Sequence, residues 1–136
     1  MMIFIDTSAF LALENRTDEY HTQALIFRDF LLQSKEPLLT SDYVLDESYT
    51  IIRMRAGHSI AVEFGEMIQA SDLVEVKYVP KEILGEAWRI FKSFADKQFS
   101  FTDCTSFAFM ESLEIPAAFT FDHHFNQYGK FDVQPH

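Results

Sequence analysis

The sequence predicts an α/β fold: three layers, α/β/α, around a central parallel sheet of four to five strands. Short apolar runs alternate with longer segments of helical periodicity, which is typical of strands joined by crossover helices. Several of these runs are apolar throughout, as in strands covered by helices on both faces. The 136 residues, 48% of them hydrophobic, suffice for one core. We therefore expect residues 1–136 to form a single domain.

The expected strands are short, and they differ in how they are covered. Met2 to Ile5 is continuously apolar and fits a strand buried on both faces, whereas residues 74–79 alternate with period two and fit a position nearer the sheet edge. The expected strands are residues 2–5, 37–40, 74–79, 117–121 and a short fifth at 131–134.

The expected helices are placed by capping residues and by buried stripes. Ser41 or Asp42 can cap a helix that Gly57 ends, and Pro80 suits the first position of a later helix. We expect Met67 on the inward face of the helix at 59–70. The expected helices are residues 7–13, 18–33, 42–56, 59–70, 80–94 and 101–113, and the stripe of the fifth is Ile83, Ala87, Ile90, Phe91 and Phe94.

Four acids stand where the topology brings chain segments together. Asp6 directly follows the first expected strand, and Asp122 directly follows the fourth. Asp103 lies in the first turn of a helix, and Glu47 lies roughly 7.5 Å along the helix that begins at Asp42. In parallel α/β sheets, the carboxyl ends of strands and the amino ends of helices share one edge, where ligands bind. We therefore expect the four carboxylates to meet.

Clustered carboxylates point to a metal. Like charges within ~4–6 Å raise each other's pKa, and a divalent cation is the natural counter-charge. Oxygen ligands alone suit Mg²⁺ or Mn²⁺ better than zinc. Such ions act in the hydrolysis of phosphodiesters, where they activate water and stabilise the departing oxygen.

Glu47 carries a further signal. Its neighbours at helical spacing are mostly apolar, so the carboxylate points partly into the apolar stripe of its helix. A carboxylate in that setting should be paired or should coordinate a metal. The neighbours are Val44, Ser48, Ile51 and Met54.

Each acid also has a purely structural interpretation. Asp6 can cap a helix, Asp103 can form a capping box with Ser100, and Asp122 can be a turn residue. Glu47 can pair with a basic side chain. Singly, each structural role is the commoner one, but four such placements at one edge favour a shared site.

The pattern resembles the PIN domain family, the metal-dependent ribonuclease fold of VapC-type toxins. The order and spacing of the matching segments carry the resemblance, which extends from Ile3 to about Gln134. The segments are Ile5-Asp6-Thr7-Ser8-Ala9, Leu39-Thr40-Ser41 through Glu47, Ser100-Phe101-Thr102-Asp103, and Thr120-Phe121-Asp122-His123-His124-Phe125 before Gly129.

The resemblance implies an endoribonuclease with Mg²⁺ or Mn²⁺ as cofactor. It further implies RNA as substrate, products with 5′ phosphate and 3′ hydroxyl ends, a homodimer and a small antitoxin protein as inhibitor. Thr7 or Ser8 can orient a water or a phosphate oxygen, or can only cap the helix. The resemblance assigns catalysis and metal binding to Asp6, Glu47, Asp103 and Asp122.

Composition restricts how such a protein can act. The formal net charge of −10 argues against broad electrostatic binding of nucleic acid, so RNA must be held locally by metal and a few basic residues. The single cysteine, Cys104, excludes an intramolecular disulfide and fits a reducing cytoplasm. No apolar run approaches the ~18 residues of a membrane span, and Asp6 interrupts the apolar start, so we expect neither membrane insertion nor a signal peptide.

Other functions remain open at this point. A PIN-like fold with a weak metal site can be an RNA- or protein-binding module, and a solitary RNA-processing nuclease has the same ligands. A receiver domain requires an acid pair after the first strand, where only Asp6 is present, and a haloacid-dehalogenase-type phosphatase requires an Asp where Ser8 stands. His123 and His124 are adjacent and point apart, so at most one can easily face the site, as a metal ligand that would shift the preference toward zinc or iron or as a base. The favoured interpretation for this pair is a loop role.

Overall fold

A computed structural model, which describes residues 1–136, contains one five-stranded parallel sheet in the order β3-β2-β1-β4-β5. The predicted three-layer α/β/α class is confirmed, and the number of strands is the upper of the two expected. The strands are β1 (Ile3–Ile5), β2 (Leu38–Ser41), β3 (Val74–Lys77), β4 (Ala117–Phe119) and β5 (Asp132–Gln134).

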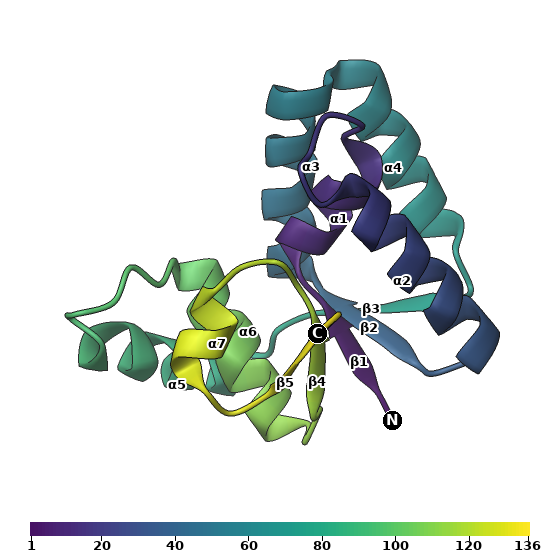
Figure 1. Ribbon diagram of the computed structural model, residues 1–136. Coiled ribbons are helices and arrows are strands. Elements are labelled where there is room, and N and C mark those ends of the chain that lie inside the picture. Colours follow the sequence, from purple (N-terminus) through teal and green to yellow (C-terminus); the bar gives the residue numbers. More distant parts are fainter.

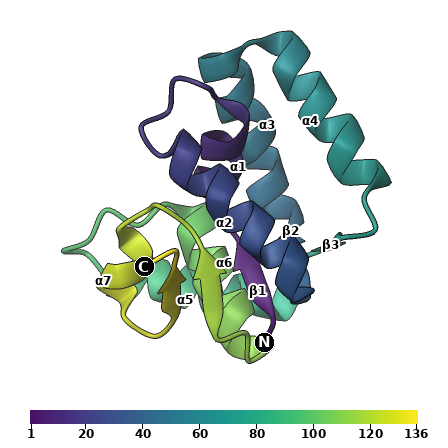
Figure 2. The same ribbon diagram turned by 45° about the vertical axis from the view of Figure 1, so that its right-hand side comes forward.

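Seven helices flank this sheet. Figure 1 shows α1 to α4 gathered in one part of the molecule and α5 to α7 in another, with the sheet between them. In Figure 2 the helices α3 and α4 form an antiparallel pair that meets at Gly57. The helices are α1 (Thr7–Glu14), α2 (His21–Ser34), α3 (Asp42–Ala56), α4 (His58–Ala70), α5 (Lys81–Ser93), α6 (Phe101–Ser112) and α7 (His124–Tyr128).

The strand order reverses direction between β1 and β4. From β1 the chain goes to β2 and β3 on one side, and to β4 and β5 on the other. Ile5 pairs with Phe119, so both strands end at the same level, one residue before Asp6 and three before Asp122. The sheet therefore has its topological switch point beside two of the expected site residues.

The helix starts use the expected caps. Ser41 Oγ accepts the Val44 N–H at 3.1 Å, and Ser100 and Asp103 form a reciprocal capping box. Gly57 ends α3 with φ of 102°, a conformation that disfavours side chains with a Cβ. These local interactions set the amino ends of α3 and α6 at the carboxyl edge of the sheet.

The core is aromatic, and some helix faces are more exposed than the periodicity predicted. Phe4, Phe107 and Phe119 are fully buried, but Met67 is 51% exposed and Phe91 42% exposed, so their predicted burial was wrong. The Phe91 ring contacts Phe101 at 5.9 Å and Trp88, itself 52% exposed, at 5.7 Å between centroids. Apolar residues at the border of a helix face still recur at helical spacing. They stay exposed where no neighbouring helix or strand covers them.

Two helices differ from the expected pattern. The second begins at His21 rather than Asp18, because Asp18 Oδ1 accepts the Tyr20 N–H at 2.8 Å and holds a turn there. The last, α7, was not predicted, since five residues are too few to show helical periodicity. None of the helices has both the length and the apolar character that crossing a bilayer requires.

Thr40 extends the contact between β1 and β2 to the edge of the sheet. Its buried hydroxyl donates to the Ile5 carbonyl at 2.8 Å, directly before Asp6. We predict that Thr40→Val, which keeps the shape but loses the hydroxyl, lowers the free energy of unfolding by about 1–3 kcal/mol. Thr40→Ser should recover most of the loss. Chemical denaturation of wild type and of the two variants measures the free energy of unfolding. A Thr40→Val protein as stable as wild type would contradict the role of this hydrogen bond.

Candidate metal centre

Asp6 is buried at the end of β1, and hydroxyl groups fix its carboxylate. Oδ2 accepts the Thr120 hydroxyl at 2.9 Å and the Ser8 hydroxyl at 3.0 Å, and the Ser8 N–H lies at 3.4 Å as the helix cap. Oδ1 has no hydrogen-bond partner in the protein. One oxygen of Asp6 is thus held by the fold, and the other remains available to a ligand.

Thr120 connects Asp6 to the loop after β4. While its hydroxyl donates to Asp6, its oxygen accepts the Asp122 N–H at 3.0 Å. The Ser8 hydroxyl accepts the Phe121 N–H at 2.9 Å in the same network. These bonds set Asp122 next to Asp6, although 116 positions separate them in the chain. Thr120 lies in an expected strand segment, and nothing in its sequence context indicates this role.

Asp103 enters the same region from the first turn of α6. It is buried, and Oδ2 accepts the Ser100 N–H at 3.0 Å as part of the capping box. Glu47 reaches the region from the second turn of α3 and is partly buried. The Thr7 hydroxyl lies beside it and also contacts the Val44 carbonyl at 3.4 Å. Thr7 and Ser8 thus have structural partners, and their role toward a phosphate stays a prediction.

The pKa shifts show how close these acids are to one another. Burial raises the pKa of Asp6 to about 7, with further contributions from the charges of Asp103 and Asp122. Burial also raises the pKa of Glu47 and of Asp103, and the Asp122 carboxylate adds to both shifts. The charges of Asp103 and Asp122 therefore act on Asp6 and Glu47, but the group of residues with ligand atoms within 4.8 Å of one another contains Asp103, Asp122 and His124 and neither Asp6 nor Glu47.

No lysine or arginine pairs with any of these four acids. The ring nitrogens within 4 Å of these acids belong to His123 and His124. The amino ends of α1, α3 and α6 point toward the acids and offset part of the repulsion. Carboxylates gathered in this way, without a basic partner, fit a divalent cation with oxygen ligands.

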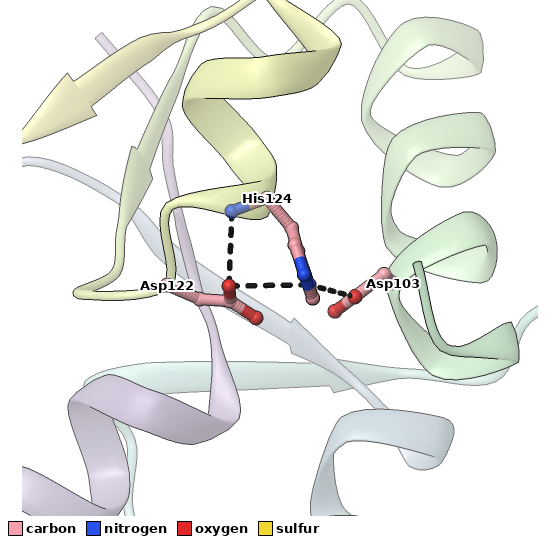
Figure 3. A group of neighbouring side chains, drawn as sticks. All are labelled: Asp103, Asp122 and His124. Atoms are coloured by element: carbon pink, nitrogen blue, oxygen red, sulfur yellow. Dashed lines mark hydrogen bonds and ion pairs between the residues drawn. The ribbon is translucent and has the colours of Figure 1, made fainter. Parts of the chain in front are cut away.

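His124 was expected from the sequence to favour a loop role, and that prediction was wrong, because it begins α7 and its ring contacts two of the acids. Figure 3 shows its ring between Asp103 and Asp122, with Nδ1 2.8 Å from Asp103 Oδ2 and 3.3 Å from Asp122 Oδ1. The three side chains offer ligand atoms within 4.8 Å of one another. His123, by contrast, is exposed, so the expectation that only one of the two histidines can face the site is confirmed.

Comparison with known proteins gives consistent results. The PIN domain profile matches residues 3–131. The 23S rRNA-specific endonuclease VapC20 of Mycobacterium tuberculosis is 37% identical over 135 residues, which cover 98% of this chain and 99% of VapC20. Its crystal structure, described as that of a sarcin-ricin loop cleaving toxin, superposes with a TM-score of 0.86.

A more distant structure shares the fold alone. VapBC2 from Rickettsia felis, bound to a DNA fragment from its promoter, superposes with a TM-score of 0.71 at 10% identity. The alignment covers 98% of both chains. The architecture is thus common to proteins whose sequences have diverged almost completely.

The raised pKa of Asp6 predicts a pH-dependent stability of the metal-free protein. The folded state holds the Asp6 proton up to about pH 7, whereas an unfolded Asp releases it near 3.8. Stability contributed by this proton is therefore present at low pH and is lost as the pH rises toward and through 7. Between pH 5 and pH 8 the loss is about 3 kcal/mol.

Asp6→Asn should not show this loss, because its side chain stays neutral and can keep the hydroxyl contacts. We expect the difference in melting temperature, Asp6→Asn minus wild type in EDTA, to be higher at pH 8 than at pH 5 by roughly 5–10 °C. The exposed Asp46→Asn variant is the control. A difference that does not change with pH would contradict this account.

Proposed function

The chain belongs to the PIN domain family, and from this premise we propose that it is a metal-dependent endoribonuclease that acts as the toxin of a toxin–antitoxin pair. The observation that supports the proposal is the group of Asp103, Asp122 and His124, whose ligand atoms lie within 4.8 Å of one another, with Asp6 and Glu47 close enough for the charges of Asp103 and Asp122 to raise their pKa values. A cluster of uncompensated acids destabilises a protein, so its presence is best explained by a cation that it binds.

The proposed ligands are those that the sequence indicated. Asp6, Glu47, Asp103 and Asp122 would hold Mg²⁺ or Mn²⁺ and form the catalytic centre. When bound, such an ion lowers the pKa of water and stabilises negative charge on the reacting phosphate.

The surrounding residues prepare these ligands. Thr120 and Ser8 hold one Asp6 oxygen and leave the other free, and the capping box fixes Asp103 on α6. Preorganised carboxylates need little rearrangement to bind a cation. Orientation of a phosphate oxygen by Thr7 or Ser8 remains part of the proposal.

We propose structured ribosomal RNA as the substrate. VapC20 is 23S rRNA-specific, its solved structure is that of a sarcin-ricin loop cleaving toxin, and the identity of 37% extends over nearly all of both chains. A net charge of −10 gives the protein no general attraction to RNA. Recognition must therefore rely on contacts near the cleaved bond, which suits one exposed loop better than long duplexes.

The proposed partners are a small antitoxin protein and a second copy of the chain. The antitoxin follows from the description of VapC20 as a toxin, which the cell must be able to restrain. The homodimer and action in the cytoplasm follow from the family resemblance and remain predictions.

Loss of one carboxylate should abolish cleavage without unfolding the protein. We predict that Glu47→Gln lowers the Mn²⁺-dependent cleavage rate of a sarcin-ricin loop oligonucleotide by about 100-fold or more. Asp46→Asn is the matched control, because Asp46 is the preceding residue on α3 but is exposed. Cleavage should stop in EDTA and should leave 5′ phosphate ends.

The outcomes separate the competing functions. Equal activity of Glu47→Gln and wild type would reject the assigned site. RNA binding by wild type without cleavage in Mn²⁺ would favour a catalytically weak binding module.

The toxin role has a separate test in cells. Induced expression of the wild-type chain should arrest growth, whereas expression of Glu47→Gln should not. Co-expression of the product of a small neighbouring gene should restore growth. An active nuclease that leaves growth unchanged would instead favour a solitary RNA-processing enzyme.

A further inference from the structure

His124 adds a nitrogen donor to a site otherwise composed of carboxylates. We propose that His124 Nδ1 is a direct metal ligand, together with Asp103 and Asp122, and that this nitrogen makes the centre favour Mn²⁺ over Mg²⁺. The inference rests on the proposed function, since it concerns the cation that the nuclease would use. To the proposed function it adds a nitrogen ligand and a preference between Mg²⁺ and Mn²⁺, neither of which follows from the carboxylates alone.

The spacing of the three ligand atoms carries the inference. Around an octahedral ion with metal–ligand distances near 2.1 Å, neighbouring ligand atoms are ~3 Å apart. His124 Nδ1 is 2.8 Å from Asp103 Oδ2 and 3.3 Å from Asp122 Oδ1, on either side of that value. Each of the three residues offers one ligand atom within 4.8 Å of the other two, so one ion can contact all three side chains.

The fold holds the imidazole in this position. The His124 N–H donates to Asp122 Oδ1 at 2.9 Å, which ties the start of α7 to one of the other ligands. The ring packs edge-on against Phe99, with centroids 5.6 Å apart. The His124 side chain is 18% exposed, whereas that of His123 is 74% exposed, with Nδ1 3.9 Å from Asp122 Oδ1. Of the two histidines, only His124 is held between two acids.

The hydrogen bonding is compatible with ligation. Without metal, a hydrogen on His124 Nδ1 bridges to Asp103 Oδ2. A bound cation would lie to one side of the line between these two atoms and contact both after a rotation of the ring, and the neutral imidazole would then carry its hydrogen on Nε2. Nε2 has no hydrogen-bond partner in the protein, so this tautomer breaks no other contact. Asp103 Oδ2 keeps the Ser100 N–H as its second partner.

The ligand atoms determine which of the two metals the site binds more tightly. Mg²⁺ is a hard ion that favours oxygen ligands and retains water, whereas imidazole nitrogen suits later divalent metals. A centre with two carboxylates and one imidazole therefore binds Mn²⁺ more tightly, relative to Mg²⁺, than the same centre with oxygen alone.

The proposal is tested by the coordination of Mn²⁺ in the full-length protein. Pulsed electron paramagnetic resonance of bound Mn²⁺ should show a nitrogen hyperfine coupling in wild type and in His123→Asn. His124→Asn should lose it, although its amide can still donate a hydrogen bond to Asp103. A residue that only positions Asp103 through a hydrogen bond would give no nitrogen coupling in any of the three proteins.

Competition between Mn²⁺ and Mg²⁺ gives a second readout. His124→Asn should lower the ratio of Mn²⁺ to Mg²⁺ affinity by about tenfold or more, whereas His123→Asn should leave it unchanged. An unchanged ratio in His124→Asn, or bound Mn²⁺ without nitrogen coupling in wild type, would overturn the inference. The wild-type spectrum decides the question even if a variant fails to fold.

These outcomes are separable from those of the proposed function. RNA cleavage supported by Mn²⁺ with oxygen ligands alone would retain the nuclease and reject the histidine ligand. Absence of Mn²⁺ binding and of Mn²⁺-dependent cleavage would reject both.

Discussion

The repulsion among carboxylates at one edge of the sheet is the constraint on which the rest of this structure depends. Burial and neighbouring charge together raise the pKa of Asp6 to about 7. A protein tolerates such a cluster only where fixed dipoles or a bound cation offset it. Here the hydroxyls of Thr120 and Ser8, together with three helix amino ends, supply the fixed part. A bound cation would offset the remaining repulsion. The repulsion that destabilises the metal-free protein is therefore also what favours binding of a metal.

The parallel topology makes that constraint possible. Strands β1 and β4 are adjacent although the sequence between them forms two further strands and six helices. Their carboxyl ends therefore bring residues from opposite ends of the chain within reach of the Thr120 hydroxyl. The fold supplies proximity, and a few hydrogen bonds at the strand ends convert proximity into a defined geometry.

Much of this arrangement was predictable from sequence, for physical reasons that also show the limits. Capping residues and hydrophobic periods are local, so the helices from Ser41 and Ser100 and the four acids at element ends could be placed from sequence. The direction of His124 could not, because it depends on how a five-residue helix packs against Phe99. The exposure of Met67 and Phe91 was missed for a related reason: a period shows which face of a helix is apolar, not how far its neighbours extend.

The capping roles of Asp6 and Asp103 have a consequence for how such proteins diverge. Both residues stabilise a helix start as well as line the acidic site. Asn or Ser can also cap a helix at the position of Asp6, and an amide at position 103 can still accept the Ser100 N–H of the capping box, so both aspartates can be replaced while the architecture persists. Chemistry can thus disappear by single substitutions that scarcely affect folding. Family members that have lost catalysis are therefore expected to keep the fold and to serve as binding proteins. In such proteins an amide or a hydroxyl is expected at these two positions.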